Sequence, residues 1–495
     1  MLELAWPALV DIFDGNSIWF LLIGSLIGFV FAVLPGLSGP QVLALLLPVT
    51  FTMPSNDAII LLMGAAGVSA FGGSLTAILI NAPGTAQSAA TVFDGYPLTR
   101  QGRAGYAIGA AAFSSLLGAI FGAVVLTLIL PLGRYVVLAF SYPEYFMLAV
   151  MGLAMIAVLS QGSPWKSIMA GGIGFTLAFI GIDTTTGALR YTFGWDYLWD
   201  GIKLVPAIIG LFGIAEALAI FGKPGAISKE PPNTSLSGIF EGCMAVFGNF
   251  GVFLRSATIG TIIGIIPGVG GAVANFVSYG QTVATAKDKS RFGKGDIRGV
   301  IAPESANNAK DGGSLVPTLI FGIPGSLEMA VLLGALTLHG INPGPRLMLD
   351  HGNIALLLIY ALVLSNIFIA VFGVLIAKPL THITRIRTVF IAPVIMVLGL
   401  MGAYATNGYI EDAIVALAFG VIGYIMMRFD YSRIALLIAL VLGTLLQNSF
   451  HQTNDLWGIA GFFNRPISLT LFFITVLMLA MPAIVNQVQK RHARQ

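Results

Sequence analysis

The residues best suited to bind small charged ligands lie around Pro-Gly pairs that interrupt long apolar runs. Pro35-Gly36 and Pro83-Gly84 occur early in the chain, and Pro267-Gly268 and Pro324-Gly325 occur later. Proline removes an amide donor and glycine allows positive φ, so each pair is predicted to stop a helix and expose backbone groups. The N-terminus of a broken helix suits a carboxylate, whereas unwound carbonyls suit a cation. The breaks therefore predict sites for charged ligands.

Neutral polar residues accompany these breaks. Any single one of them could instead cap a helix or bond across a helix pair, but their clustering at several breaks favours a binding site. The predicted substrate-binding residues are Pro35, Gly36, Ser38, Gly39, Ser74, Asn81, Pro83, Gly84, Thr85, Pro267, Gly268, Gly270, Gly271, Asn307, Asn308, Ser314, Pro324, Gly325 and Ser326. No catalytic residue and no cofactor is predicted.

Ionisable residues near the breaks are candidates for binding a coupling ion, because a charge at membrane depth costs about 2.5–3.5 kcal/mol on insertion scales. Glu304 is the foremost candidate and Asp311 the second. Lys310 could neutralise Asp311, or both could lie at the aqueous edge. Asp94 could simply initiate a turn in Asp94-Gly95-Tyr96-Pro97. The expected ion is H⁺ or Na⁺, and a Na⁺ ion would lie near the Pro-Gly breaks.

The composition indicates which elements position these residues. Of the 495 residues, 57% are hydrophobic and 9% are charged, whereas soluble domains carry about 25% charged residues. Stretches such as Ile18 to Leu34 and Ile354 to Ala377 lack charge and are long enough to span a bilayer. Sixty glycines and 24 prolines are too many for a bundle of unbroken helices. The predicted fold class is an all-α polytopic membrane protein with about 10–12 apolar segments, some of them broken or re-entrant.

The sequence contains an internal repeat. Gly72-Gly73-Ser74-Leu75 and the Pro83-Gly84 break return in the same order as Gly312-Gly313-Ser314-Leu315 and the Pro324-Gly325 break. An apolar run separates the two blocks in each copy. Ile27-Gly28 before Pro35-Gly36 likewise returns, with the same spacing, as Ile259-Gly260 before Pro267-Gly268. These linked blocks favour true repetition over chance in a glycine-rich chain.

The repeat predicts how the chain is organised. It divides the sequence into a first half (1–221), a cytoplasmic linker (222–246) and a second half with the C-terminal spans (247–495). Clusters of Lys and Arg alternate with acidic or uncharged connections, which places the N-terminus in the periplasm and the C-terminus in the cytoplasm. The two copies would then enter the membrane from opposite sides. Inverted repeats that are broken at matching positions indicate a secondary transporter with a site at the membrane midplane.

Other function classes fit less well. The chain lacks the Gly-Lys-Ser/Thr, His-Glu-x-x-His and Gly-x-Ser-x-Gly motifs, and its five histidines are scattered, so a polytopic enzyme is disfavoured. An organic-anion channel stays open, since glycine-rich re-entrant loops also build filters. Cys243 alone permits no intrachain disulfide, and the dispersed charge argues against nucleic-acid binding. No basic segment precedes the first apolar stretch, which is read as a retained span.

Several motifs are similar to those of a known family. They are Leu34 to Gly39, Gly72 to Gly84, Asp94 to Pro97, Phe292 to Asn308 and Gly322 to Ser326. Together they resemble the large membrane subunit of tripartite tricarboxylate transporters, essentially end to end. The resemblance departs at Phe71, where the family often has tyrosine, and at Lys310 and Asp311, where small uncharged residues are typical.

The resemblance implies a multi-pass protein of the bacterial inner membrane that takes up small organic carboxylates by symport, driven by a cation gradient. Its implied partners are the lipid bilayer, a periplasmic solute-binding protein that delivers the carboxylate, and a small membrane subunit of about four spans.

The repeat also predicts that residues beside corresponding breaks face one central cavity, namely Asn81, Thr85, Asn308 and Ser326. Gly84 and Gly325 are predicted to exclude valine. Positive φ and a close approach of substrate to the backbone would both disfavour a β-branched side chain there.

Overall fold

The computed structural model consists almost entirely of helices. It describes residues 2–13, 15–34, 39–158, 164–183, 186–221, 237–267, 270–344, 347, 350–383 and 391–477. The strands among these residues are a short antiparallel pair, β1 (Gly181–Ile182) and β2 (Leu189–Arg190). The predicted all-α class is confirmed.

The helices of the first half are α1 (Leu2–Phe13), α2 (Ser17–Val33), α3 (Gly39–Thr50), α4 (Ser55–Ile80), α5 (Ala89–Arg100), α6 (Ala104–Ala139), α7 (Tyr142–Val158), α8 (Pro164–Ala178), the 3₁₀ helix η1 (Asp196–Asp200), α9 (Leu204–Ile208), the π-helical turn η2 (Ile209–Ile214) and α10 (Ala215–Phe221). Those of the second half are α11 (Ile239–Gly248), α12 (Phe250–Ile265), α13 (Gly270–Thr285), α14 (Arg298–Phe321), α15 (Leu327–Leu338), α17 (Gly352–Ile383), α18 (Ile391–Asn407), α19 (Ile410–Arg428), α20 (Arg433–Trp457) and α21 (Gly461–Asn464).

Many of these helices are long and apolar enough to cross a bilayer. Within the described residues six qualify, and the number rises to eight if two bent pairs, α1 with α2 and α11 with α12, each form one span. The bends measure 75° and 81°. Four further apolar helices of 10–17 residues are too short to cross alone, among them α3 and α15. Breaks inside apolar runs thus produce short helices that neighbouring helices must surround.

Glycine permits close helix contacts in the same way in both copies of the repeat. A Cβ at Gly28 of α2 would lie 2.6 Å from the Cα of Ala65 of α4. A Cβ at Gly260 of α12 would lie 2.6 Å from the Cα of Ala306 of α14. Small residues let helix backbones approach closely where lipid removes any hydrophobic drive for association. The pairs α2–α4 and α12–α14 are therefore equivalent packing units.

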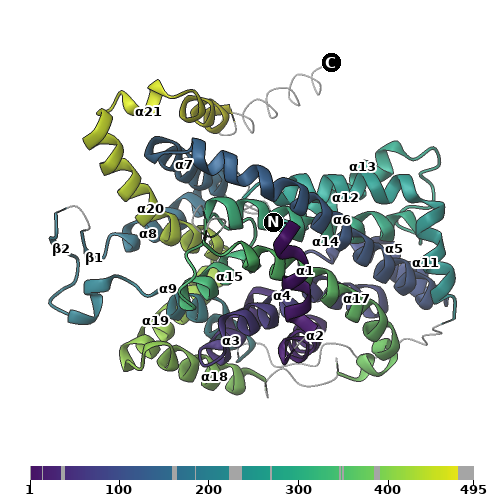
Figure 1. The fold of residues 1–495 in the computed structure, drawn as a ribbon. Coiled ribbons are helices and arrows are strands. Elements are labelled where there is room, and N and C mark those ends of the chain that lie inside the picture. Colours follow the sequence, from purple (N-terminus) through teal and green to yellow (C-terminus); the bar gives the residue numbers. More distant parts are fainter. Residues whose placement is uncertain are drawn as a thin grey trace, which may run out of the picture.

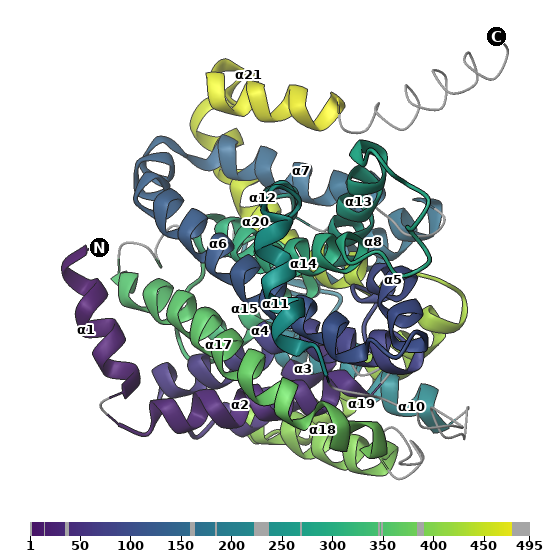
Figure 2. The ribbon, with the colours of Figure 1, turned by 90° about the vertical axis from the view of Figure 1, so that its right-hand side faces the viewer.

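The two halves interlock around these units. Helix α6 of the first half packs along α14 of the second, and α17 of the second half packs along α4 of the first. Helices α4, α14 and α15 lie at the centre of the molecule in both ribbon views (Figures 1 and 2). The C-terminal spans are also tied to the first half, because Arg465 Nε donates to Glu144 Oε1 over 2.6 Å and Arg433 Nη1 lies 3.5 Å from Glu216 Oε2.

Each central helix ends in a left-handed residue just before its Pro-Gly pair. Asn81 closes α4 with φ 58°, and Gly322 closes α14 with φ 70°. The amides after Gly322 complete the cap, since Ile323 N donates to Pro317 O over 3.2 Å. The predicted helix breaks at Pro83-Gly84 and Pro324-Gly325 are thus present, but positive φ falls two residues before each proline. The expectation of positive φ at Gly84 and Gly325 was wrong.

Candidate functional site

Two breaks are compared from here on: the first break is Pro83-Gly84 and the second is Pro324-Gly325. The helices that follow them reach across to the opposite copy of the repeat. After the first break, α5 packs against α13 and α14, and after the second break, α15 packs against α3 and α4. A Cβ at Gly39, where α3 begins, would lie 3.0 Å from Cγ of Glu328. A Cβ at Gly271, at the start of α13, would lie 2.7 Å from Cδ of Gln87. The crossed arrangement brings together the segments that follow both breaks.

Gln87 and Glu328 occupy equivalent positions and contact each other there. Each is the third residue after the glycine of its Pro-Gly pair. Gln87 Nε2 donates to Glu328 Oε1 over 3.1 Å. Asn275 of α13 holds the first of these residues in place, because its Nδ2 donates to Gln87 O over 2.8 Å. The hydrogen bond between Gln87 and Glu328 thus joins equivalent positions of the two copies of the repeat.

A buried lysine extends this contact into a charged group. Lys310 Nζ lies 2.6 Å from Asp311 Oδ1 and 3.9 Å from Glu328 Oε2. Lys310 is 1% exposed, Asp311 4% and Glu328 5%. We call Gln87, Lys310, Asp311 and Glu328 the central cluster. Lys310 and Asp311 do neutralise each other, but their burial rules out a place at the aqueous edge in this structure.

The central cluster carries an unbalanced charge. One ammonium and two carboxylates give a formal charge of −1 when all three groups are ionised. Charges removed from water interact strongly and are poorly tolerated without compensation. A monovalent cation or a proton would balance the charge of the cluster.

Asn307 adds unused hydrogen-bonding capacity on the same helix. It shares one face of α14 with Lys310, Asp311 and Ser314, at the i, i+3, i+4 and i+7 spacing. Its side chain is fully buried, and neither Nδ2 nor Oδ1 has a partner among the described residues. Buried amides are normally satisfied, so this one is free to bind a ligand or water.

Glu304 lies one to two turns away in a separate pocket of hydroxyl groups. It is fully buried and accepts hydrogen bonds from Thr91 of α5 and Ser115 of α6, the second over 2.9 Å. Ser74 of α4 also interacts with it. No ion pair to Glu304 occurs within the described residues. A buried carboxyl with hydroxyl partners is suited to hold a proton.

Asn308 joins three helices. Its Nδ2 donates to Asn366 Oδ1 of α17 over 2.5 Å, and Asn366 Nδ2 donates to Gly67 O of α4 over 3.1 Å. The Oδ1 atom of Asn308 has no partner among the described residues. Asn308 is therefore a buried connector with one acceptor still available.

Several predicted binding residues make local bonds. Thr85 and Ser88 share a hydrogen bond of 2.8 Å, and Ser326 Oγ caps α15 by accepting from Met329 N over 3.3 Å. Ser314 bonds to Asp311 O over 3.0 Å. Asn81 is exposed and acts as the cap of α4. A cavity shared by Asn81, Thr85, Asn308 and Ser326 stays a prediction.

The remaining predicted residues divide into two groups. Gly39, Gly270 and Gly271 open α3 and α13, while Pro267 and Pro324 are buried and Pro83 is half-buried beside its break. Pro35, Gly36, Ser38 and Gly268 lie outside the described residues. Most of the linker (residues 222–236) and the basic segment Lys490 to Arg494 also lie outside them.

Asp94 fastens a loop instead of contacting the central cluster. Its Oδ1 accepts from the amides of Gly295 and Asp296, each over 2.9 Å, and Tyr279 donates to its Oδ2 over 3.0 Å. Arg298 Nη2 closes the loop on Asp296 Oδ2 at 2.6 Å. Burial opposes ionisation of Asp296, but hydrogen bonds and the charge of Arg298 outweigh it and hold the pKa of Asp296 below its ordinary value. The role of Asp94 is thus structural.

The described residues contain no group of three His, Cys, Asp or Glu side chains that would hold a metal ion. A Na⁺ site of neutral oxygens would differ from such a group, since backbone carbonyls and amide oxygens suffice for it. Its existence stays a prediction.

Sequence reasoning missed Gln87 and Glu328. They stand outside the Pro-Gly motifs, and each alone is an ordinary polar residue near a helix start. The usable signal was their equal spacing from Gly84 and Gly325, which places them at the same point of the repeat.

These features define a class: an all-α, multi-pass membrane protein whose broken helices meet at a buried polar site. Residues 18–438 match the model of the tripartite tricarboxylate transporter TctA family, and the chain belongs to that family. It is 33% identical over 437 residues to an uncharacterized 52.8 kDa protein of the TAR-I ttuC' 3' region of Agrobacterium vitis, covering 88% of this chain and 86% of the relative.

A second relative covers less of the chain. It is an uncharacterized protein of the TAR-II ttuC' 3' region of Agrobacterium vitis, 29% identical over 230 residues, which are 46% of this chain and 95% of the relative. No solved structure matches.

Proposed function

We propose that the protein is the membrane subunit of a secondary active transporter that takes up small organic carboxylates in symport with a cation. The observation that carries the proposal is the central cluster, where the two broken helices meet around a formal charge of −1. Membership of the tripartite family supports the wider assembly. In it, a periplasmic solute-binding protein delivers the carboxylate, and a small membrane subunit completes the carrier.

The charge of the central cluster suggests how an anion and a cation become coupled. Lys310 is the cation available to a substrate carboxylate, but Asp311 and Glu328 already compete for it. Protonation of one of them, or Na⁺ bound beside them, would release Lys310 to the substrate. Cation and carboxylate then bind cooperatively, because a carboxylate alone would bring the cluster to −2 and the cation offsets the added charge.

Glu304 provides a second place for the coupling ion. Its hydroxyl partners come from α4, α5 and α6, so a change in its protonation acts on the first break and on α14 together. A proton carried here would couple through helix packing, whereas a cation at the central cluster would couple through direct contact. The two routes differ in which carboxyl group is essential.

Transport in vesicles separates these routes. The protein is reconstituted with its partner subunits and binding protein, and uptake of a labelled carboxylate is measured under a Na⁺ gradient or a pH gradient. Glu304→Gln should abolish pH-driven uptake if Glu304 carries the proton, and leave sodium-driven uptake intact if Na⁺ is the coupling ion. If the coupling ion binds at the central cluster, Glu328→Gln should make carboxylate uptake independent of the ion gradient.

The same vesicles test the class of transporter. Saturable uptake that requires both the binding protein and a cation gradient supports a coupled carrier. Uptake that runs down the substrate gradient alone, indifferent to both ions, would refute it and favour an organic-anion channel.

We further propose that the protein lies in the bacterial inner membrane with its N-terminus in the periplasm, its C-terminus in the cytoplasm and its halves inverted. Cys243 is the single native cysteine, so a cysteine-free variant and single cysteines are simple to make. A cysteine at Trp195 should react with an impermeant reagent from outside, and one at Lys287 only from inside. Reaction of both from one side would contradict this orientation.

A further inference from the structure

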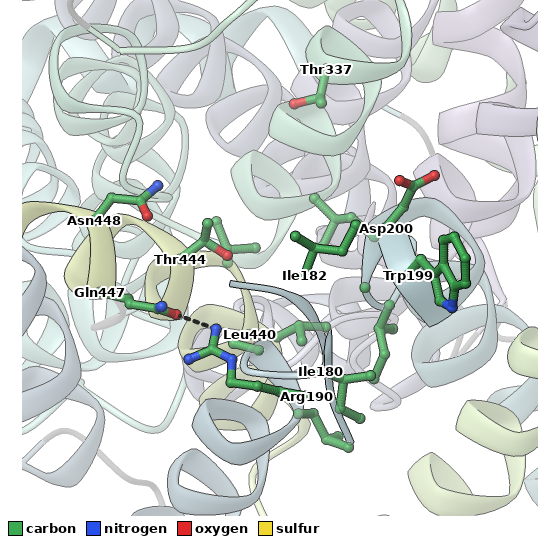
Figure 3. Close-up of a pocket in the computed structure, with 16 residues that line it drawn as sticks. Ile180, Ile182, Arg190, Trp199, Asp200, Thr337, Leu440, Thr444, Gln447 and Asn448 are labelled. Carbon is green, nitrogen blue, oxygen red and sulfur yellow. Dashed lines mark hydrogen bonds between the residues drawn. The ribbon is translucent and has the colours of Figure 1, made fainter. Parts of the chain in front are cut away.

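A cavity with an arginine lies away from the central cluster, beside the β1–β2 hairpin. Its volume is about 530 Å³, within the range of small-molecule sites. Figure 3 shows Arg190 and Gln447 on one side, joined by a hydrogen bond, and Trp199 and Asp200 on the other. The hairpin projects from one edge of the molecule, at the left of Figure 1.

Arg190 has donor capacity that the described residues do not use. Its Nη2 donates to Gln447 Oε1 over 3.0 Å, and its Nη1 lies 3.6 Å from Asp183 Oδ2, beyond hydrogen-bonding distance. Its Nε is buried and has no hydrogen-bond partner among the described residues. A guanidinium carries five N–H donors in a fork that matches a carboxylate. A bound carboxylate would satisfy the donors that remain.

The rest of the cavity suits the body of an organic acid. Thr337, Thr444 and Asn448 place polar side chains on its wall, while leucine, isoleucine, valine and tryptophan side chains form most of the remaining wall. The carboxylate of Asp200, which also lines the cavity, lies 2.9 Å from Lys203 Nζ and is thereby neutralised. Asp183 is the anion that most directly competes for Arg190.

Helix α15 connects this cavity to the central cluster. Glu328 lies in its first turn and Thr337 near its end. Nine residues of α-helix span about 13 Å, so an acid in the cavity would lie one short helix away from Lys310. The hairpin belongs to the connection predicted to face the periplasm, from which the binding protein delivers its cargo.

We propose that this cavity is a second carboxylate site, in which Arg190 binds a small organic acid at the outer face before it reaches the central cluster. Its position on the transport route rests on the proposed function, whereas carboxylate binding by Arg190 does not.

Direct binding to the purified subunit complex tests the site without transport. Citrate, succinate and benzoate are titrated separately, and quenching of Trp199 fluorescence is assigned by comparison with Trp199→Phe. Arg190→Gln should weaken binding at least about tenfold, as expected for the loss of a charge-assisted contact. Arg255→Gln is the matched control, because this exposed arginine donates to Gly251 O on α12 and Thr285 Oγ1 on α13 and does not line the cavity.

Two further variants keep the test valid if Arg190→Gln fails to fold. Thr444→Phe should fill the cavity and block binding without altering Arg190. Asp183→Asn should tighten binding several-fold, because it removes the anion that competes for Arg190. If the ion pair of Arg190 with Asp183 served structure alone, Asp183→Asn would instead weaken binding, as Arg190→Gln does.

The outcomes are distinguishable from those of the proposed function. Weaker binding with Arg190→Gln and Thr444→Phe, together with a raised KM and unchanged kcat for uptake, would support the site. Unchanged binding by both variants, or no saturable binding of any of the three acids to the wild-type complex, would overturn it. Coupled uptake that persists in either of these cases would leave the proposed function standing.

Discussion

The two Pro-Gly breaks share their backbone structure and differ in chemistry. Each follows a central helix with a left-handed cap, at Asn81 and at Gly322. Each places its glycine against backbone, because a Cβ at Gly84 would lie 2.7 Å from Gly73 Cα and one at Gly325 2.6 Å from Ser314 Cα. The same backbone motif, a left-handed helix cap followed by a tightly packed Pro-Gly pair, therefore occurs in both copies.

The polar residues that follow the breaks are not duplicated. The first break presents the neutral Gln87, and the second presents Glu328 beside Lys310 and Asp311. Because the two meet in one cluster, a single set of charges serves both copies. The two copies thus share their backbone geometry at the break, whereas the charged residues of the central cluster all lie in the second.

The largest effect is expected from adding a side chain at either break. We predict that Gly84→Val or Gly325→Val abolishes uptake while much of the protein stays in the membrane. The added atoms would meet the carbonyl of Ala32 in the first case and that of Ser314 in the second. Uptake and the amount of protein in the membrane are measured together.

Matched controls exist for both glycines. A Cβ at Gly172 of α8 or Gly251 of α12 would meet nothing within 4 Å, so valine there should be tolerated. Normal uptake by Gly84→Val or by Gly325→Val would show that transport does not require a glycine at that break. If the variants were instead lost from the membrane, the glycines would be needed for helix packing and folding, and the lower uptake would follow from that loss.

A charge exchange tests whether Gln87 and Glu328 are truly equivalent. Gln87→Glu would place two carboxylates about as close as the present 3.1 Å contact, and like charges at that distance resist joint ionisation. We expect uptake at neutral pH to fall at least about tenfold. The double variant Gln87→Glu with Glu328→Gln should recover part of it. If the double variant took up no more carboxylate than Gln87→Glu, the positions of Gln87 and Glu328 would not be equivalent.

The sequence predicted the breaks and the class of protein because both depend on local residue types. Long charge-free runs, Pro-Gly pairs and a repeated order of motifs are visible without tertiary contacts, and the caps at Asn81 and Gly322 lie where the breaks were expected. Glu304 and Asp311 were also recognisable, since a charge in an apolar context stands out on its own.

The partners of these residues could not be predicted in the same way. The contact between Gln87 and Glu328 joins residues 241 positions apart and exists only because α5 and α15 cross to the opposite copy. The charge pair of Lys310 with Glu328 follows from that crossing. Asp94 likewise gained its role from a loop far along the chain.

The first break has a further support that can be removed separately. Asp94 on α5 accepts the amides of Gly295 and Asp296, and the loss of both bonds in Asp94→Ala leaves two buried donors unsatisfied. We expect a destabilisation of about 2–4 kcal/mol, and less protein in the membrane. The KM of the remaining protein should stay unchanged, and an altered KM would place Asp94 in the binding site itself.

The smallest effect concerns the pH dependence of that support. Burial raises the pKa of Asp296, but hydrogen bonds from Arg298 outweigh it and hold the pKa below its ordinary value of 3.8. The contribution of Asp296 to stability is therefore present above that value. It is lost as the pH falls through the lowered pKa of the folded state. Arg298→Gln should therefore reduce thermal stability at neutral pH, by about 1 kcal/mol or less for a partly exposed pair, and the difference from wild type should shrink in acid. Thermal unfolding of both proteins across this pH range measures it, and a difference that grows on acidification would contradict the assigned ion pair.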